Sequence, residues 1–521
     1  MTEYTHLEKI RVQKIEELRA EGIEPYPTRA ERSHTSQQAI AALTAAEAAA
    51  GIAAGSTTGQ PAVEVRVTLA GRIRATRPMG KLVFTHIEDG TGKIQLFLRV
   101  NELGQEKVDF FNKMFDLGDF IQASGVMMRT RTGEATLQVH DFHMLAKSVS
   151  PLPADKDETL EDGTVLRHAA LEDPELRARQ RYADLAVNPD VRETFRKRAA
   201  VIKSIRNFLD GNDFLEVETP ILQPLYGGAA ARPFTTHHNE LEQDMYLRIS
   251  FELYLKRLLV GNFERVYEIG RDFRNEGVSF KHNPEFTQLE FYWAYADYLQ
   301  VMELTEQMIA HVCDTVFGTR KFVFDKDENT HYELDFSAPW KRVQMRQGII
   351  DTSGIDIADY PTAESLFQAI VSKHPGKNPD PHAARGKLID FLVGEFLEPT
   401  LIQPTFLYDY PRDISPLAKS KPGDPLTVER FEGYAAGFEL CNAFTELNDP
   451  LDQEQRFLEM GRDYTDEEEE KHPMDEDYLR AMRYGMPPNG GFGMGVDRLT
   501  MLLTNKRSIR EVLLFPALRN E

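Results

Sequence analysis

The segment FRNEGVSFKHNPEF, residues 273–286, combines side chains that could bind a nucleoside triphosphate. Arg274 stands at the end of a predicted strand, where a fixed guanidinium can bind a phosphate through paired hydrogen bonds. Glu276 follows two residues later, on the same face of an extended chain, and Phe286 begins the next predicted strand and could stack on a purine. An Arg–Glu surface pair or a core Phe explains each residue better when it is taken singly. Their joint spacing favours a nucleotide site.

A glycine-rich strand leads into an apolar helix in GGFGMGVDRLTMLL, residues 490–503. The glycines permit close approach to the backbone, and Arg498 falls in the first turn of the predicted helix. Alone, this pattern is weak evidence for a ligand site. An Arg498 that caps the helix and pairs with Asp497 explains the segment equally well.

Three glutamates recur at intervals of seven residues: Glu432, Glu439 and Glu446. If residues 430–449 form a strand, a turn and a second strand, these carboxylates could converge. Two carboxylates beside a triphosphate suit Mg²⁺, because that ion takes few protein oxygens together with phosphates and water. A pair of charged residues at a sheet edge is the alternative.

A large C-terminal domain, predicted over residues 186–521, positions all three segments. Residues 266–273 and 285–295 have the pattern of two antiparallel strands, with the polar sequence RNEGVSFKHNP as the long hairpin loop between them. Residues 320–400 are less clearly patterned, and we expect them to form an insertion in this domain.

A small β-barrel is predicted over residues 63–148. Apolar residues alternate with polar ones in five segments, and a short helix fits between the third and the fourth; the expected elements are 63–69, 82–87, 94–100, the helix 105–115, 120–129 and 135–144. Three strands, a helix and two strands is the order of an OB-fold, which often binds oligonucleotides. We expect a helical extension and a linker over residues 1–62, and a connector over residues 149–185.

Composition excludes several classes of protein. The 521 residues have no run of eighteen apolar residues and no apolar segment at the start, so neither a membrane span nor a secretory signal is predicted. Cys313 and Cys441 are the only cysteines, too few for a disulfide framework, and a reducing, cytoplasmic setting follows. The net charge of −22 argues against a general nucleic-acid coat protein but leaves a local basic face open.

Together these segments resemble the motifs of class II aminoacyl-tRNA synthetases. The helix and strand that end at Pro220 look like motif 1, FRNE and its loop like motif 2, and GMGVDR like motif 3. The chain is most similar to the lysyl-tRNA synthetases, in GGAAARPF, MYLRI, ELYLKRL and NAFTELND. The resemblance implies an α+β fold, with an N-terminal OB-fold barrel and a catalytic antiparallel sheet flanked by helices. It also implies a homodimer that uses ATP, L-lysine, tRNA(Lys) and Mg²⁺.

The resemblance assigns roles to residues at the ATP end of the site. Arg274 would hold the α-phosphate and the lysine carboxylate, and Arg498 the γ-phosphate. Phe286 and Arg498 would enclose the adenine. The other implied ATP and metal residues are Glu276, near the adenine or the substrate, His282, near the phosphates, and Glu432 and Glu439, which would carry Mg²⁺.

The resemblance also implies a lysine pocket. Gly228 and Glu252 would bind the α-amino group, and Glu446 and Tyr292 the ε-ammonium. The remaining pocket candidates are Asn442 and Phe444. An acidic and aromatic set of this kind suits an ammonium on an apolar stem, whereas an aspartate pocket would need a cation.

The OB-fold would read the anticodon. Phe84 could stack on a base and Gln95 could read its edge. The other implied contacts are Arg77 and Lys81, with phosphates or bases, and Glu134, through a hydrogen bond. An ordinary surface Phe would be the simpler interpretation of Phe84 without the family context.

Two features depart from the family pattern. A small residue and a proline usually precede the glutamate of ELYLKRL, whereas this chain has Ser250 and Phe251, which could reshape the backbone at Glu252. Residues 160–185 are longer than the usual connector.

Three other functions are compatible with parts of the pattern. A sister synthetase for aspartate or asparagine shares the motifs, but the pocket carboxylates argue against it. An amino-acid ligase that modifies a protein typically lacks the OB-fold. A non-catalytic RNA-binding protein on this fold would be expected to lose Arg274, Glu276 or Arg498, and all three are present.

Overall fold

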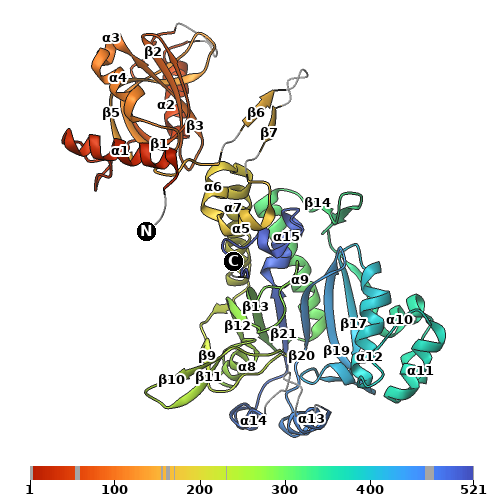
Figure 1. The fold of residues 1–521 in the computed structure, drawn as a ribbon. Coiled ribbons are helices and arrows are strands. Elements are labelled where there is room, and N and C mark those ends of the chain that lie inside the picture. Colours follow the sequence, from red (N-terminus) through yellow and green to blue (C-terminus); the bar gives the residue numbers. More distant parts are fainter. Residues whose placement is uncertain are drawn as a thin grey trace. The chain divides into compact units, whose positions relative to one another are not determined.

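The computed structural model describes residues 4–52, 59–153, 156–159, 165–168, 171–229, 231–463 and 474–519 (Figure 1). The chain forms two compact units, residues 1–172 and residues 173–521. Parts of the expected linker, residues 53–58, and of the expected connector, residues 154–155, 160–164 and 169–170, lie outside the described residues.

A closed five-stranded barrel forms the centre of the first unit, in the order β1-β2-β3-β5-β4. Its strands and the two helices between β3 and β4 are β1 (Arg66–Met79), β2 (Leu82–Glu88), β3 (Lys93–Arg99), α3 (Val100–Leu103), α4 (Gln105–Met114), β4 (Phe120–Arg129) and β5 (Ala135–Ala146). Alternate residues such as Val83 and Ile87 are fully buried, as the period of two predicts for strands with one inner face. The predicted OB-fold is confirmed.

Two N-terminal helices pack on the barrel, α1 (His6–Ala20) and α2 (Ser36–Ala49). Thr5 and Thr35 begin them with capping boxes, in which side chain and backbone satisfy each other's free hydrogen-bonding groups. Leu18 and Leu43 are buried in the same hydrophobic cluster as the barrel interior. The N-terminal extension therefore shares the core of the barrel.

A two-stranded hairpin follows the barrel, and two short helices open the second unit. These elements are β6 (Lys156–Thr159), β7 (Val165–His168), α5 (Pro174–Arg179) and α6 (Arg181–Val187).

The second unit is built on a nine-stranded sheet that is antiparallel except at its two ends (Figure 1). The strand order is β16-β17-β19-β20-β21-β13-β12-β8, and β18 pairs with β19 beside this path. The strands are β8 (Leu215–Glu216), β12 (Arg265–Phe273), β13 (Glu285–Ala294), β16 (Lys341–Gln344), β17 (Thr405–Pro411), β18 (Ser420–Lys421), β19 (Asp424–Ala435), β20 (Phe438–Thr445) and β21 (Asn489–Gly495). The expected antiparallel catalytic sheet is confirmed.

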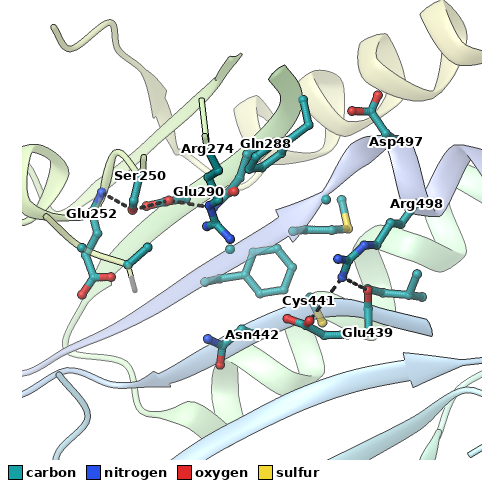
Figure 2. A pocket seen from close by; sticks show the side chains of 18 of the residues that line it. Ser250, Glu252, Arg274, Gln288, Glu290, Glu439, Cys441, Asn442, Asp497 and Arg498 are labelled. Carbon is teal, nitrogen blue, oxygen red and sulfur yellow. Dashed lines mark hydrogen bonds and ion pairs between the residues drawn. The ribbon is translucent and has the colours of Figure 1, made fainter. Parts of the chain in front are cut away.

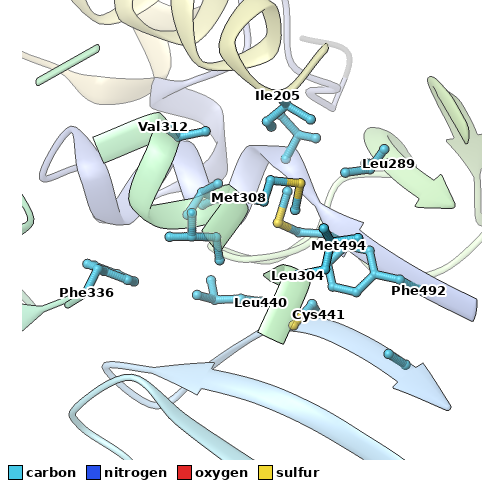
Figure 3. Close-up of a cluster of buried hydrophobic side chains, with 14 of the residues drawn as sticks. Ile205, Leu289, Leu304, Met308, Val312, Phe336, Leu440, Cys441, Phe492 and Met494 are labelled. Carbon is cyan, nitrogen blue, oxygen red and sulfur yellow. The ribbon is translucent and has the colours of Figure 1, made fainter. Parts of the chain in front are cut away.

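Helices cover one face of this sheet and leave room for a pocket on the other. The covering helices are α7 (Pro189–Asp210), α9 (Tyr298–Val312) and α15 (Val496–Leu503). Their buried side chains, among them Ile205, Met308 and Val312, pack with Leu289 and Met494 of the sheet (Figure 3). This large core fixes the central strands that carry the site.

Smaller elements surround the sheet. The elements that precede β12 in the chain are β9 (Leu222–Gln223), β10 (Thr235–His238), β11 (Gln243–Leu247) and α8 (Glu252–Val260). The elements in the expected insertion are β14 (Lys321–Asp325), β15 (His331–Asp335), α10 (Met345–Ser353), α11 (Ala363–Lys373) and α12 (Arg385–Leu392). Two more helices, α13 (Pro450–Asp463) and α14 (Glu476–Arg483), follow β20. The helices α10 to α12 pack in a hydrophobic cluster of their own with strands β17 and β19.

Candidate active site

A cavity of about 420 Å³ lies on the face of the central strands that α9 leaves open (Figure 2). Strands β13, β20 and β21 form its floor, and the loop between β12 and β13 forms one wall. The predicted site residues that line it are Gly228, Glu252, Arg274, Glu276, His282, Phe286, Tyr292, Glu439, Asn442, Phe444, Glu446 and Arg498. Segments distant in sequence thus converge as the motifs predicted.

The motif 2 hairpin has the predicted form. Strands β12 and β13 pair antiparallel from Arg265 opposite Trp293 to Phe273 opposite Glu285. The backbone N–H of Arg274 donates to the carbonyl of Pro284 at 2.8 Å and closes the base of the loop. Side chains at every second position of β13 face the cavity, because a strand turns alternate residues to one face.

Arg274 is held close to the cavity with spare hydrogen-bonding capacity. Its guanidinium carbon lies 5.2 Å from the centre of the Phe286 ring, and Nη2 lies 3.5 Å from the carbonyl oxygen of Ile249. Its Nε is buried and makes no hydrogen bond to the described residues. A buried donor without a partner is costly, so this arginine is ready to bind an anionic ligand.

The carboxylate behind Arg274 is also short of partners. Asp272 is fully buried, and neither of its side-chain oxygens has a hydrogen bond in the described part of the chain. Burial raises the pKa of Asp272 well above its usual value, and the nearby Glu290 raises it further, whereas Arg274 and Arg248 lower it. The strands below the site therefore carry a dense network of buried charges.

Glu290 is a pocket residue that the sequence did not single out. Its Oε1 accepts hydrogen bonds from Ser250 Oγ and Gln288 Nε2, both at 2.8 Å, and its Oε2 accepts one from the hydroxyl of Tyr292 at 3.1 Å. Burial, followed by repulsion from Glu252, raises the pKa of Glu290 to about 7. Its position two residues before Tyr292 on a predicted strand was the signal that could have found it.

Two further buried carboxylates face the same end of the cavity. Glu446 is fully buried after β20, and Glu252 begins α8 with 5% of its surface exposed. Lys256, one helical turn after Glu252, lies between them: Nζ is 2.6 Å from Glu252 Oε1 and also forms an ion pair with Glu446 Oε2. The sequence did not identify this lysine. Burial raises the pKa values of Glu252 and Glu446, and attraction to Lys256 opposes that rise.

Two glycines leave space at this end of the cavity. A Cβ on Gly491 would lie 1.8 Å from Glu446 Oε1 and 2.6 Å from a ring carbon of Tyr292. Gly228 has a φ of +86°, and a Cβ there would lie 2.9 Å from Ser250 Oγ. Any larger residue would collide with the groups that line the cavity.

Phe251 does not remove Glu252 from the cavity. Its ring is fully buried, and the guanidinium carbon of Arg248 lies 4.0 Å from the ring centre. The backbone N–H of Phe251 points to Glu290 Oε1 at 3.3 Å. The departure from the family pattern therefore places a core aromatic at this position while α8 still begins at Glu252.

The opposite end of the cavity carries Arg498 and the loop. Arg498 Nη1 donates to the carbonyl of Glu439 at 2.9 Å and lies 3.2 Å from Glu439 Oε2 (Figure 2). Asp497 instead accepts from the backbone N–H of Thr287 at 2.8 Å and pairs with Arg198. Arg498 therefore pairs with Glu439 and not with Asp497, which was the alternative interpretation of the sequence.

His282 lies beside these charges on the loop. Its Nδ1 is 2.9 Å from Ser279 Oγ. Burial lowers the pKa of His282, and repulsion from Arg498 adds to that effect. Both effects favour the neutral form of the ring.

Glu432 lies on β19, apart from the cavity lining. Its Oε1 accepts from Arg430 Nη2 and its Oε2 from the Tyr434 hydroxyl, both at 2.6 Å. Glu439 lines the cavity, but Glu432 is not one of its lining residues in the part of the chain that the structure describes. Burial raises the pKa of Glu432, and the charge of Glu439 raises it further, so the two carboxylates are close enough to interact.

An aromatic pair lies on the outer face of the barrel. The rings of Phe84 and Phe97 stack with centres 4.5 Å apart and planes 9° apart. Val83 and Thr85, on either side of Phe84, are fully buried, so Phe84 points outward. The guanidinium carbon of Arg99 lies 5.5 Å from the centre of the Phe97 ring. Nucleic-acid bases stack on platforms of this kind.

Polar groups flank this pair. Gln95 Nε2 donates to Glu134 Oε2 at 2.9 Å, so these two predicted residues touch. Arg77 is the partner of Phe84 in the register of β1 and β2, and Lys81 lies in the turn between those strands. The barrel therefore gathers all five predicted anticodon residues around one face.

Comparison with known proteins decides the family. The model for tRNA synthetases class II (D, K and N) matches residues 173–519, and the model for OB-fold nucleic acid binding domains matches residues 67–145. A lysine–tRNA ligase of Chloroflexus aurantiacus is 50% identical over 99% of both chains. A lysine–tRNA ligase of Pelotomaculum thermopropionicum is 48% identical over 98% of this chain and 95% of the relative. One of Dehalococcoides mccartyi is 49% identical over 99% of this chain and 98% of the relative.

The chain belongs to the class II lysyl-tRNA synthetases. The resemblance stated from its motifs is therefore confirmed. In the described part of this synthetase, no helix is both long and apolar enough to cross a membrane.

Proposed function

We propose that the cavity of this synthetase activates L-lysine with ATP and transfers it to the 3′ end of tRNA(Lys). The observation that carries this function is the pairing of opposite charges at the two ends of one cavity. Three carboxylates, Glu252, Glu290 and Glu446, meet at one end, and Arg498 lies at the other, with Arg274 between them. Lysine and a triphosphate have the complementary charges.

Catalysis in this cavity requires no protein nucleophile. A carboxylate oxygen of lysine attacks the α-phosphorus of ATP in line, and pyrophosphate leaves. Arg274 holds both the lysine carboxylate and the α-phosphate, which brings the reacting atoms together and stabilises the negative charge on the α-phosphoryl oxygens in the transition state. The terminal ribose hydroxyl of the tRNA then attacks the carbonyl of the lysyl adenylate, and AMP leaves.

ATP binds at the open end of the cavity. Phe286 stacks on the adenine, which Arg498 covers from the other side while it holds the γ-phosphate. Glu276 contacts the adenine, and His282 lies near the phosphates. The unpartnered Nε of Arg274 and the partial exposure of Arg498, at 22% of its side chain, support these roles.

Lysine binds at the buried end. Glu252 and the backbone at Gly228 receive the α-ammonium, and Glu446, Glu290 and Tyr292 receive the ε-ammonium. Phe444 flanks the methylene stem, and Asn442 lines the cavity beside it. A buried carboxylate is stable only with a cation or hydrogen-bond donors, so this end strongly favours a cationic substrate.

Carboxylates suitable for Mg²⁺ lie at the ATP end. Glu439 is 42% exposed and faces the cavity, and its charge adds to the burial that raises the pKa of Glu432. Both offer the hard oxygen donors that this ion prefers, and phosphates and water would complete its shell. Bound there, Mg²⁺ would neutralise charge on the phosphates.

The barrel face reads the anticodon. Phe84 and Phe97 offer the stacking surface, Gln95 and Glu134 the hydrogen-bonding groups, and Arg77 and Lys81 the positive charge.

The synthetase acts as a homodimer in the cytoplasm. Its β8 lies at the end of the large sheet, and Leu215 together with Ile221 and Leu222 just beyond it is 45–48% exposed. An edge strand with exposed apolar residues favours pairing with a second copy. The family's motif 1 includes this strand.

Pyrophosphate exchange with each of the twenty amino acids tests the assignment. We expect ATP-dependent exchange with lysine well above that with the other nineteen, because the buried carboxylates match only a long cationic side chain. Exchange with aspartate or asparagine but not with lysine would assign the chain to a sister specificity.

A further inference from the structure

The lysine end of the cavity contains a lysine of the protein itself. Lys256 is fully buried. It lies on the same face of α8 as Glu252, which precedes it by one helical turn. Its Nζ contacts Glu252 and Glu446, and it lies 5.9 Å from the centre of the Tyr292 ring and 5.5 Å from that of Phe444. Of these groups, Glu252, Glu446 and Tyr292 are assigned to the two ammonium groups of the substrate, and Phe444 is assigned to its methylene stem.

Charge explains why a cation is needed there. Beyond the larger effect of burial, repulsion from Glu252 raises the pKa of Glu290, and repulsion from Glu252 and Glu290 raises the pKa of Glu446. Glu290 is satisfied by hydrogen bonds from Ser250, Gln288 and Tyr292. Glu446 has no such donor among the described residues, so the ammonium of Lys256 is the group that compensates it.

The titratable groups in and around the site of Lys256 come from several elements. Glu252 precedes it on α8, Glu290 and Tyr292 lie on β13, Glu446 follows β20, and Tyr478 faces it from α14. A more distant cation, Arg430 on β19, also attracts Glu252 but forms its own ion pair with Glu432.

We propose that Lys256 is a positioning residue for lysine recognition, which keeps the carboxylates of Glu252 and Glu446 ionised and oriented for the substrate's two ammonium groups. Lys256 is a single buried cation beside the carboxylates of Glu252 and Glu446, so negative charge remains there for the ammonium groups of the substrate. The proposal rests on the proposed lysine specificity and adds a residue that does not itself react.

The uncharged variant Lys256→Met tests this role in the full-length enzyme. Without the cation, at least one of the two carboxylates takes up a proton, and a neutral carboxyl group binds ammonium weakly. We expect the KM for lysine in pyrophosphate exchange to rise about tenfold or more at pH 7, which corresponds to one unit of pKa change. The KM for ATP should stay within about threefold, because the ATP groups lie at the other end of the cavity.

The pH profile separates charge from packing. Loss of Lys256 raises the pKa of a carboxyl group, so the protonated fraction of that group falls as the pH is raised from 6.5 to 8.5. The ratio of the variant's KM for lysine to that of the wild type should therefore be largest at pH 6.5 and fall as the pH rises. Glu290 is present in both enzymes, so dividing the two KM values cancels the pH dependence that its titration gives to both.

Two companion variants control the experiment. Arg257→Met removes the next cation of α8, which pairs with Asp475 at 2.7 Å instead of with the cavity, and should change the KM for lysine less than about twofold. Lys256→Arg keeps the charge, so its KM ratio should not vary with pH even if the larger group weakens binding. This variant carries the test if Lys256→Met does not fold, as judged by its thermal unfolding.

Several results would overturn the proposal. An unchanged or lower KM for lysine in folded Lys256→Met would mean that Lys256 is neutral or competes with the substrate. A raised ratio that is flat from pH 6.5 to pH 8.5 would mean that Lys256 only packs. A ratio for Lys256→Arg that falls with pH would equally refute a role for the charge. Since the wild type is assayed alongside, failure of lysine specificity itself would show separately, as absence of exchange with lysine.

Discussion

The two ends of the cavity solve the problem of charge in opposite ways. At the lysine end, Glu290 and Glu446 are buried to 97% or more and are held by partners within the protein. At the ATP end, Glu439 and Arg498 pair with each other but remain 42% and 22% exposed. A small substrate with three charged groups requires a preorganised site, because the desolvation of each group must be compensated. A triphosphate brings its own counter-ions and tolerates a more open one.

The supporting elements differ in the same way. Strands β13 and β21 and helix α8 carry the lysine end. The ATP end includes residues 274–284, a loop whose Val278 and Phe280 are 45% and 56% exposed. The loop is tied down at a few points, such as the hydrogen bond from the backbone N–H of Ile509 to the carbonyl of Phe280 at 2.8 Å. The lysine end is therefore the rigid part, and the ATP end is the part that can adjust to its ligand.

Arg274→Ala should have the largest effect, because this residue serves both ends. We expect lysine-dependent pyrophosphate exchange to fall at least about 10³-fold, since the arginine stabilises the charge that forms during the reaction. The oligomeric state measured by sedimentation should not change. Retention of more than a tenth of the exchange rate would refute its phosphate role.

A matched control for Arg274→Ala lies on the same strand. Arg271 pairs with Glu285 at 3.5 Å and is 40% exposed. Arg271→Ala should therefore keep exchange within about twofold of the wild type. A comparable loss in both variants would point to damage to the hairpin instead of to chemistry.

The sequence pointed to residues at both ends of the cavity but missed Glu290 and Lys256 at the lysine end, and the reason is physical. Arg274, His282 and Phe286 lie in one hairpin, where spacing along the chain sets spacing in the fold. Glu290 lies on a strand that was correctly predicted, but its role depends on Ser250 from a different segment. Such a contact between distant segments has no local signal.

Lys256 illustrates the limit most clearly. In the sequence it is one of two adjacent basic residues on a short helix, where an exposed lysine is the ordinary expectation. Its burial follows from the ion pair with Glu446, which lies 190 positions later in the chain. By contrast, the barrel order and the antiparallel sheet were predictable, because alternation and turn residues specify strands locally.

Glu446→Gln should have the second-largest effect, and it should weaken the binding of lysine much more than that of ATP. The amide keeps the shape but removes a buried charge that pairs with Lys256, so we expect the KM for lysine to rise about 10²-fold, as for other broken buried ion pairs. The KM for ATP, measured in the same exchange assay, should change less than about threefold. Equal rises in both values would mean that the cavity behaves as a single coupled site.

Glu429→Gln provides the comparison for Glu446→Gln. Glu429 accepts a hydrogen bond at 2.7 Å from Oγ1 of Thr445, the residue that precedes Glu446. Glu429 itself is not one of the cavity-lining residues in the described part of the chain. This variant should leave the KM for lysine within about threefold of the wild type, because it removes a carboxylate that does not face the substrate.

Phe286→Leu should have the smallest effect on KM of these variants, and it should weaken the binding of ATP more than that of lysine. Leucine retains apolar contact but loses the flat ring that stacks on adenine and packs 5.2 Å from the guanidinium of Arg274. Stacking on an aromatic ring contributes about 1–3 kcal/mol, so the KM for ATP should rise roughly tenfold while the KM for lysine stays within about twofold. Phe280→Leu alters an exposed ring on the same loop and should leave both values near those of the wild type. If Phe286→Leu instead raised the KM for lysine, Phe286 would act mainly by positioning Arg274, and the open end would be as tightly preorganised as the buried one.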